Sequence, residues 1–213
     1  EGEKIMESLR EQLQTEKDGH GIFVVSTRGK APYADGKDIY EISQELGIPM
    51  AETVAKITVE TGGDCQCVFF SMDINDVYYL LKQDISIGSD GSAYPLDPAK
   101  NEGRHHPRNF GTFPCFLRLA REQNMCDLET AIYRITKKSA DIIGITDRGV
   151  LKEGMAADIT IFDGDKIADR ATYKNPFQKA EGLYHVIVNG EVAILNGEQT
   201  AARAGKFLRK TEM

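Results

Sequence analysis

The sequence of 213 residues lacks several features, and each absence excludes a class of protein. Basic residues are outnumbered, since 26 Lys and Arg stand against 33 Asp and Glu, for a net charge of −7. A nucleic-acid-binding protein would carry a basic face, so we expect no nucleic-acid partner. No apolar run approaches the roughly 20 residues that cross a bilayer, so we expect no membrane. No signal peptide is visible, so the expected location is cytoplasmic. The sequence also shows no internal repeat and no low-complexity segment.

Cysteine is scarce, and its spacing fits neither a zinc ribbon nor a disulfide scaffold. Two of the four cysteines, Cys65 and Cys67, are two apart in a strand-like run, so both point to one face. Two such thiols could bind a metal ion, but we interpret them as buried structural thiols. The other two are Cys115 and Cys126.

Histidine is equally scarce, and none of the four forms a His-x-His pair. His105 and His106 are adjacent and would point apart in an extended segment, which makes a poor chelating pair. His20 precedes a predicted strand and His185 lies within one, so we interpret both as structural.

The first 62 residues predict a small helical unit rather than half of a βαβ repeat. Apolar residues at four-residue spacing predict a helix over 4–17. Glycines mark the ends of two further helices. The expected order is helix 4–17, strand 22–26, loop 27–37, helix 38–46 and helix 48–61.

The middle of the chain predicts a parallel βαβ unit of strand 67–70, a helix from Ser71 or Asp73 to Leu81, and strand 85–87. Helices 113–123 and 127–139 and a short turn at 141–144 are expected next. After residue 149 the pattern changes to strands 158–162, 183–188 and 191–195. Asn189-Gly190 is a strong hairpin signal, so these strands predict a small antiparallel sheet.

An acid stands at the expected end of the Ile85–Gly88 strand. In α/β barrels the carboxyl ends of strands meet at the active site, so Asp90 is a candidate catalytic carboxylate. Gly91 would let a substrate approach the backbone closely. Arg108 follows on a Pro-rich loop and carries a guanidinium that matches a carboxylate. On local chemistry alone, however, a Ser-Asp-Gly turn and a solvated arginine explain these residues better.

The motifs Gly88-Ser-Asp-Gly91, His106-Pro-Arg108 and Gly111-Thr-Phe-Pro114 resemble the C-terminal part of the N-acyl-D-amino-acid deacylases, or D-aminoacylases. These belong to the metal-dependent amidohydrolase superfamily, and the resemblance runs from about residue 36 to 208. Further matching segments are Asp147–Gly149, Gly154–Ile159, Asp169–Thr172, Val188–Gly190 and 200–205.

The resemblance implies an α/β fold: the last part of a (β/α)8 amidohydrolase barrel plus a small antiparallel sheet that is part of a β-sandwich. It implies three segments. Residues 1–62 are a lid-like insertion, 63–148 the C-terminal βα units of the barrel, and 149–213 the sandwich portion and C-terminal tail.

The resemblance also implies zinc-dependent hydrolysis of N-acyl-D-amino acids. Asp90 would be the acid/base, able to face a second metal ion, and Arg108 would bind the substrate carboxylate. Ser89, Gly91 and His106 would lie beside the substrate, His106 also supporting Arg108. The family's other metal ligands lie on earlier barrel strands, so this chain looks like a C-terminal fragment that binds no stoichiometric zinc.

Other interpretations stay open at this point. Dihydroorotase-like and isoaspartyl-dipeptidase-like substrates fit the same superfamily chemistry. A non-catalytic fragment that self-associates through open barrel edges is the other alternative, and the expected partner is a second copy, as a homodimer, or the missing N-terminal portion. We assign no role to three polar residues of the N-terminal segment, Lys30, Tyr33 and Lys37.

Overall fold

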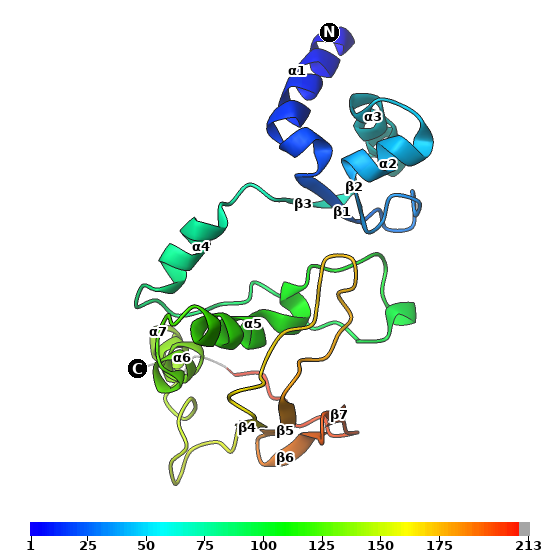
Figure 1. Ribbon diagram of the computed structural model, residues 1–213. Helices are drawn as coiled ribbons and strands as arrows, with labels where there is room; N and C mark the ends of the chain where they lie inside the picture. The colour runs from blue at the N-terminus through cyan, green and yellow to red at the C-terminus, as the bar shows by residue number, and fades with distance from the viewer. Residues whose placement is uncertain (209–213) are drawn as a thin grey trace. The chain divides into compact units, whose positions relative to one another are not determined.

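The computed structural model describes residues 1–208, which fold as two compact units (Figure 1). Unit 1 comprises Glu1–Ile74, Ala93–Pro107 and Thr172–Phe177. Unit 2 comprises Asn75–Ser92, Arg108–Ala171 and the chain from Gln178 onward. The division into segments at 62/63 and 148/149 stays a prediction, and its C-terminal tail beyond residue 208 lies outside the described residues.

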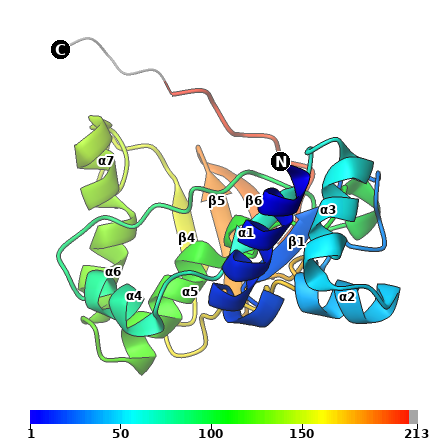
Figure 2. The same cartoon turned by 90° about the horizontal axis from the view of Figure 1, so that it is seen from above.

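Unit 1 is built on an antiparallel sheet of order β2-β1-β3, with three helices gathered beside β1 (Figure 2). All five residues of β1 are buried, and Val24 packs with Leu13, Ile42 and Ile57 from the three helices. The elements are α1 (Gly2–Thr15), the 3-10 turn η1 (Lys17–Gly19), β1 (Ile22–Ser26), β2 (Lys37–Asp38), α2 (Ile39–Leu46), α3 (Met50–Thr61), β3 (Gln66–Phe69) and the 3-10 turn η2 (Pro98–Lys100).

The predicted helix pair of unit 1 is confirmed, because local signals define both helices. The Asp38 side chain accepts a hydrogen bond from the Glu41 backbone amide, and the Glu41 side chain accepts one from the Asp38 backbone amide. These two bonds form a capping box at the start of α2. Gly47 and Gly62 end the two helices with φ values of 66° and 65°, where a side chain would be strained.

The predicted parallel βαβ unit is wrong in this structure. β3 pairs antiparallel with β1, with Phe23 opposite Val68. Residues 85–88 form no strand, and every strand pair within residues 1–208 is antiparallel. β3 pairs instead with the free edge of β1, a strand of the same unit.

Unit 2 packs helices around the segment that was expected to be the second strand. Arg134 of α6 is only 2% exposed, and it donates from Nε to the Ile85 carbonyl at 2.7 Å. Its guanidinium lies 4.8 Å from the Phe116 ring centroid. The Arg134 backbone carbonyl also accepts the Ile87 amide at 3.4 Å, so Arg134 satisfies two backbone groups of residues 85–87 where a neighbouring strand was expected. The helices are α4 (Ile74–Leu81), α5 (Arg108–Glu122), α6 (Leu128–Ile135) and α7 (Lys137–Ile143).

Two predicted helix boundaries in unit 2 are wrong. α5 begins at Arg108, five residues before the predicted start, so Arg108 lies in a helix and not on a loop. The single helix predicted over 127–139 is broken at Thr136, whose φ of −127° and ψ of −93° are not helical. The chain resumes as α7, which takes up most of the turn predicted at 141–144 and ends at Gly144.

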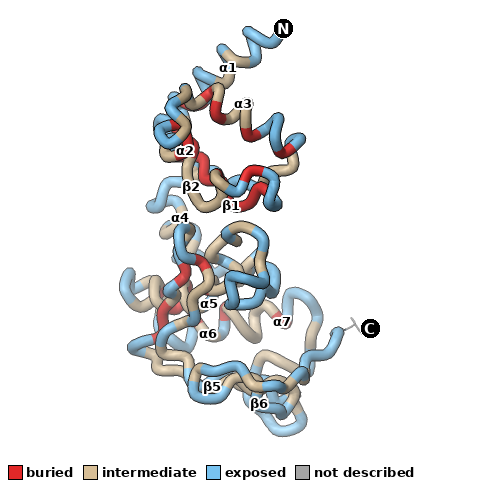
Figure 3. Tube along the Cα trace, turned by 90° about the vertical axis from the view of Figure 1, so that its right-hand side faces the viewer, coloured by how far each residue is buried: buried red, intermediate tan, exposed pale blue. Residues whose placement is uncertain are grey.

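The predicted C-terminal sheet is confirmed as an antiparallel sheet of order β4-β5-β6-β7. Asn189 and Gly190 both have positive φ, as a two-residue hairpin turn requires. None of its four strands has a buried residue, in contrast to β1, α2 and α3 (Figure 3). The strands are β4 (Ile159–Phe162), β5 (Leu183–Val188), β6 (Glu191–Leu195) and the unpredicted β7 (Glu198–Gln199).

Candidate functional site

Asp90 and Arg108 form an ion pair in unit 2, with Oδ2 of Asp90 2.9 Å from an Nη atom of Arg108. The two residues are far apart in sequence, and the start of α5 brings the guanidinium to the loop that carries Asp90. The Asp90 side chain is 86% exposed and that of Arg108 is 43% exposed. The carboxylate and the guanidinium are therefore both accessible to a small molecule.

The Asp90 loop has a defined conformation, although it does not follow a strand as predicted. Asp90 has a φ of 47°, in the left-handed region that aspartate tolerates better than most residues. The Gly91 amide donates to Ser89 Oγ at 3.1 Å, and the Ser92 amide donates to Asn109 Oδ1 at 2.7 Å. The loop is therefore held on one side by its own serine and on the other by α5.

Gly91 lies where the loop passes close to α5. A Cβ at this position would lie 3.1 Å from Asn109 Oδ1 and 3.3 Å from Asn109 Cα. These contacts are tight, so a side chain at Gly91 would require Asn109 to move by a few tenths of an ångström.

A shallow hollow of about 250 Å³ lies where this loop meets the first turns of α5. Arg108 is the charged residue among those that line it. Ten residues of unit 2 line it: Ser89, Gly91, Ser92, Arg108, Asn109, Phe110, Gly111, Thr112, Phe113 and Pro114. Three of the predicted site residues, Ser89, Gly91 and Arg108, thus meet at one hollow, beside Asp90.

The position of α5 depends on Asp169, which belongs to the Asp169–Thr172 motif. Arg118 of α5 donates from Nε to Asp169 Oδ1 at 2.8 Å, and this hydrogen bond raises the pKa of Arg118. Gly111 lies against Asp169 so closely that a Cβ there would come within 2.8 Å of Asp169 Cβ. Asp169 therefore positions the helix that carries Arg108.

His106, expected near the substrate, belongs to unit 1. Its Nε2 atom lies 3.1 Å from the Tyr173 hydroxyl, and the two rings meet edge-on. His105 stacks on Tyr94 with ring centroids 3.6 Å apart, and burial lowers the pKa of His105. Both rings are engaged within unit 1.

The remaining histidines have structural contacts, as interpreted from the sequence. His20 Nδ1 lies 2.9 Å from Asp38 Oδ2 and its ring packs on Tyr40. His185 Nδ1 accepts the Asn196 amide at 3.2 Å.

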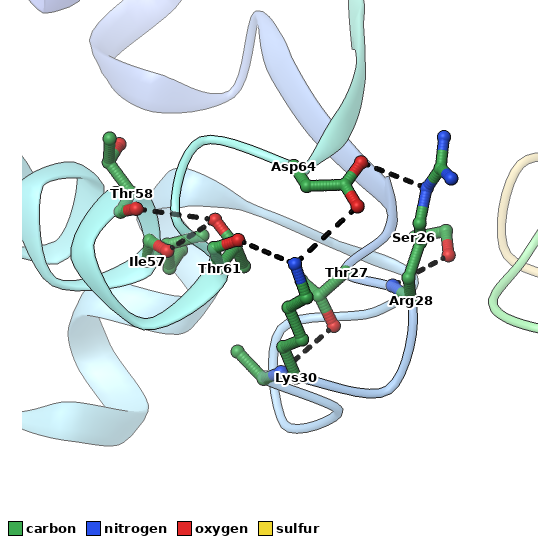
Figure 4. Close-up of polar contacts among 9 residues, drawn as sticks. Ser26, Thr27, Arg28, Lys30, Ile57, Thr58, Thr61 and Asp64 are labelled. Atoms are coloured by element: carbon green, nitrogen blue, oxygen red, sulfur yellow. Dashed lines mark hydrogen bonds and ion pairs between the residues drawn. The ribbon is translucent and has the colours of Figure 1, made fainter.

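The three polar residues left without a role are tied to neighbours in unit 1. Lys30 donates to the Thr61 carbonyl at 2.9 Å and lies 3.5 Å from Asp64, which Arg28 also pairs at 2.9 Å (Figure 4). The Tyr33 hydroxyl donates to Glu60, and burial, followed by this contact, raises the pKa of Tyr33 to about 12. Lys37 pairs with Glu45.

The described residues do not supply a catalytic metal centre. Within residues 1–208, no group of three or more His, Cys, Asp or Glu side chains is arranged to hold a metal ion. A catalytic zinc ion ordinarily has three protein ligands, so this set does not fit one. Asp90 could contribute at most a single carboxylate. The expectation that Cys65 and Cys67 are buried thiols is wrong, because Cys65 is half-buried and Cys67 is exposed.

Two residues of this site were missed from sequence. Asn109 holds the Asp90 loop, and the signal was its place directly after His-Pro-Arg. Asp169 holds α5, and the signal was its place in a matched motif for which no role had been assigned.

No helix within the described part of the chain is both long and apolar enough to cross a membrane.

Comparison with known proteins gives a consistent picture. The profile described as "Amidohydrolase family" matches residues 74–194. An N-acyl-D-aspartate deacylase of Alcaligenes xylosoxydans xylosoxydans is 37% identical over 180 residues, covering 83% of this chain and 34% of that protein. A D-aminoacylase of the same organism is 34% identical over 182 residues, covering 84% of this chain and 35% of that protein.

Solved structures agree with the sequence matches. The crystal structure of N-acyl-D-glutamate deacylase from Bordetella bronchiseptica was determined with zinc and a phosphonate inhibitor that mimics the reaction's tetrahedral intermediate. It aligns with a TM-score of 0.71 and 28% sequence identity, over 84% of this chain and 36% of that one. The chain thus spans about a third of the length of the relatives it matches.

Proposed function

Because this chain belongs to the amidohydrolase family, we propose that it is the C-terminal part of a metal-dependent deacylase that hydrolyses N-acyl-D-amino acids. Relatives named for N-acyl-D-aspartate and D-amino-acid substrates support this proposal, as does a relative solved with zinc. The activity belongs to the longer protein, since this chain spans about a third of its relatives.

The observation that carries the proposal is the meeting of Asp90 with Arg108 at 2.9 Å beside the hollow. Deacylation of an N-acyl amino acid needs a base near the amide and a cation for the free carboxylate. Here the acid and the cation stand on two different segments; Arg108 lines the hollow, and Asp90 lies beside it, between the lining residues Ser89 and Gly91.

We assign the two residues complementary roles. The carboxylate of Asp90 takes a proton from the attacking water and delivers it to the leaving amine. The guanidinium of Arg108 binds the substrate carboxylate, for which its planar fork is suited. Because Asp90 pairs with Arg108 in this structure, a bound substrate carboxylate would replace Asp90 on the guanidinium.

The metal ligands would come from residues outside this chain, because the described residues do not provide them. In the longer protein, preceding strands would supply the parallel neighbours that β3 and residues 85–88 lack here. Residues 63–148 would then complete a (β/α)8 barrel, and β4–β7 would join a β-sandwich. Bound zinc would supply activation of the attacking water.

The test uses the longer protein, read from the same gene with the residues upstream of Glu1. It should release free amino acids from N-acyl-D-amino acids and leave the L enantiomers intact. Equal turnover of both enantiomers, or hydrolysis of dihydroorotate or isoaspartyl dipeptides in their place, would contradict the proposed substrate class.

A further inference from the structure

A buried arginine in unit 2 lies beside the segment that leads to Asp90. Arg134 of α6 is only 2% exposed, and its Nη2 atom has no hydrogen-bond partner within residues 1–208. A buried cation without a carboxylate destabilises the fold unless hydrogen bonds compensate for the lost water. Here backbone oxygens compensate, since Nε donates to the Ile85 carbonyl at 2.7 Å and Nη1 donates to the Leu81 carbonyl at 2.8 Å. The buried guanidinium therefore holds the chain just before Asp90.

The junction of α6 and α7 holds the same segment through further hydrogen bonds. The Arg134 carbonyl accepts the Ile87 amide at 3.4 Å, and the hydroxyls of Ser86 and Ser139 lie 2.6 Å apart. Because Ser139 donates its proton to the Arg134 carbonyl at 3.1 Å, the Ser86 hydroxyl is the donor between the two serines. The segment is thus fastened to the helices up to the residue before Gly88.

The loop beyond this segment has few contacts of its own. Within the described residues, nothing but its chain neighbours would lie within 4 Å of a Cβ at Gly88. The Asp90 side chain is 86% exposed and pairs with Arg108. A substrate carboxylate that replaces Asp90 on Arg108 would remove this contact. The position of Asp90 would then depend on the two ends of its loop, held by Asn109 after it and by Arg134 before it.

We propose that Arg134 is a positioning residue for Asp90. It fixes the segment that enters the loop, so that the carboxylate keeps its place when a substrate occupies Arg108. The inference rests on the proposed function, because that function makes Asp90 the acid/base. A misplacement of about 1 Å can cost about 10²-fold in rate, so loss of this anchor should be visible in kcat.

Arg134→Met in the longer protein tests the anchor. Methionine keeps an apolar side chain against the Phe116 ring but donates no hydrogen bond. We expect kcat to fall by about 10²-fold, since Asp90 loses its fixed position. KM should change little, because Arg108 is carried by α5, which stays packed.

Arg121→Met is the matched control. Arg121 of α5 also donates to two backbone carbonyls of unit 2, those of Gly164 and Ile167, at 2.8 Å and 3.2 Å. These carbonyls lie outside the segment that leads to Asp90, so this variant should keep the wild-type kcat. An equal fall of kcat in Arg121→Met and Arg134→Met would count against positioning.

The same substitution in the Asp90→Asn background separates positioning from a general loss of structure. If Arg134 acts through Asp90, Arg134→Met should lower kcat little further there, because no carboxylate is left to position. Equal losses in both backgrounds would overturn the proposal and leave Arg134 a structural residue. Unchanged turnover in Asp90→Asn alone is a different failure, since it would refute the proposed role of Asp90 itself.

Ser139→Ala decides the question if Arg134→Met fails to fold. This variant removes the acceptor of Ser86 and leaves the guanidinium in place. It should lower kcat by a smaller factor than the loss of Arg134, and again little in the Asp90→Asn background. Unchanged kcat in a folded Ser139→Ala would then overturn the proposal.

Hydrogen exchange on the 213-residue chain gives a readout that does not depend on activity. In Ser139→Ala and in Arg134→Met, backbone amides of residues 85–92 should exchange faster than in the wild type. Amides of β4, another element of unit 2, should keep their rates. Unchanged exchange over 85–92 would contradict the anchor, whatever the kinetics show.

Discussion

Asp90 and Arg108 are each other's partner in this structure, and that pairing has consequences for catalysis. An exposed ion pair contributes little to stability, typically about 0–1 kcal/mol, so a substrate carboxylate can replace it at small cost. Exchange of one carboxylate for another on Arg108 would release Asp90 for proton transfer. The residue scale therefore yields two predictions for the longer protein.

Replacement of Asp90 by Asn should lower kcat by about 10²–10⁴-fold, because the amide cannot take the proton from water. KM for a carboxylate substrate should not rise, since Arg108 loses its internal anionic competitor. Asp84→Asn is the matched control, because Asp84 is an exposed carboxylate that pairs with a cation, Lys138, outside the hollow. Steady-state kinetics with metal content checked measures both variants, and unchanged turnover in Asp90→Asn would return Asp90 to a turn residue.

Replacement of Arg108 by Lys keeps the charge but removes the fork, so KM for N-acyl-D-amino acids should rise by about tenfold or more. A substrate whose carboxylate is capped as an amide should already be turned over poorly by the wild type. Its turnover should fall little further in Arg108→Lys. Arg170→Lys is the control, because Arg170 pairs with Glu181 on the surface. Equal losses on the capped and uncapped substrates would mean that Arg108 has a structural role.

At this scale the sequence predicted two residues that the fold brings together, but not the residues that support them. Asp90 and Arg108 were identified from the motif resemblance and not from local chemistry, and the fold brings them within 2.9 Å. Asn109 and Asp169 were not identified, because each acts through a tertiary contact that no local pattern encodes.

At the scale of elements, a largely covered arginine, with a side chain 14% exposed, connects the residue before β4 to the hairpin turn. Arg148, from the Asp147–Gly149 motif, forms an ion pair with Asp158 and donates to Asn189 Oδ1 at 2.6 Å. Asp158 Oδ1 in turn accepts the Asn189 amide at 2.7 Å. Burial would raise the pKa of Asp158, but the Asn189 amide and Arg148 outweigh it, so the pKa is lowered.

The stability that Asp158 contributes should therefore depend on pH. Because the pKa of Asp158 is lower in the folded state, its ionised carboxylate stabilises the fold fully at pH values above the unfolded-state pKa of about 4. This stabilisation is lost as the pH falls through the folded-state pKa. Asp158→Asn should cost about 1 kcal/mol at pH 7, since the site is partly exposed. Thermal melts from pH 7 to 3 should show this gap close below about pH 4, and a gap that stays constant would contradict the ion pair.

Helix prediction succeeded where caps are local, as at Asp38 and Gly47, and strand prediction succeeded at the Asn189-Gly190 hairpin. Strand direction was not predictable, because β3 can pair with any available edge. The segment 85–88 has the composition of a strand, yet two of its backbone groups, the Ile85 carbonyl and the Ile87 amide, bond to Arg134 and not to a neighbouring strand.

At the scale of the whole molecule, much apolar surface is uncovered. None of the eight residues of α4 is buried, although the helix carries Val77, Leu80 and Leu81. Leu151 of unit 2 is 77% exposed, and no strand of the C-terminal sheet has a buried residue. Short helices derive most of their stability from packing, so these apolar surfaces suit contact with a further chain or segment.

The isolated chain should therefore self-associate while its charge of −7 keeps it in solution. Light scattering across a dilution series should give a mass above that of the monomer, which falls as the protein is diluted. The upstream segment, supplied in trans or in the same chain, should abolish this self-association. A well-folded and strictly monomeric chain at micromolar concentration would show that these surfaces need no partner.

Metal content and activity, measured together on the chain alone and on the longer protein, test the central claim most directly. The claim is that Asp90 and Arg108 serve a metal centre whose ligands lie outside this chain. Elemental analysis and deacylase assay should find tightly bound zinc and hydrolysis of N-acyl-D-amino acids in the longer protein, and neither in the chain of 213 residues. Stoichiometric zinc together with deacylase activity in the chain alone would contradict the account.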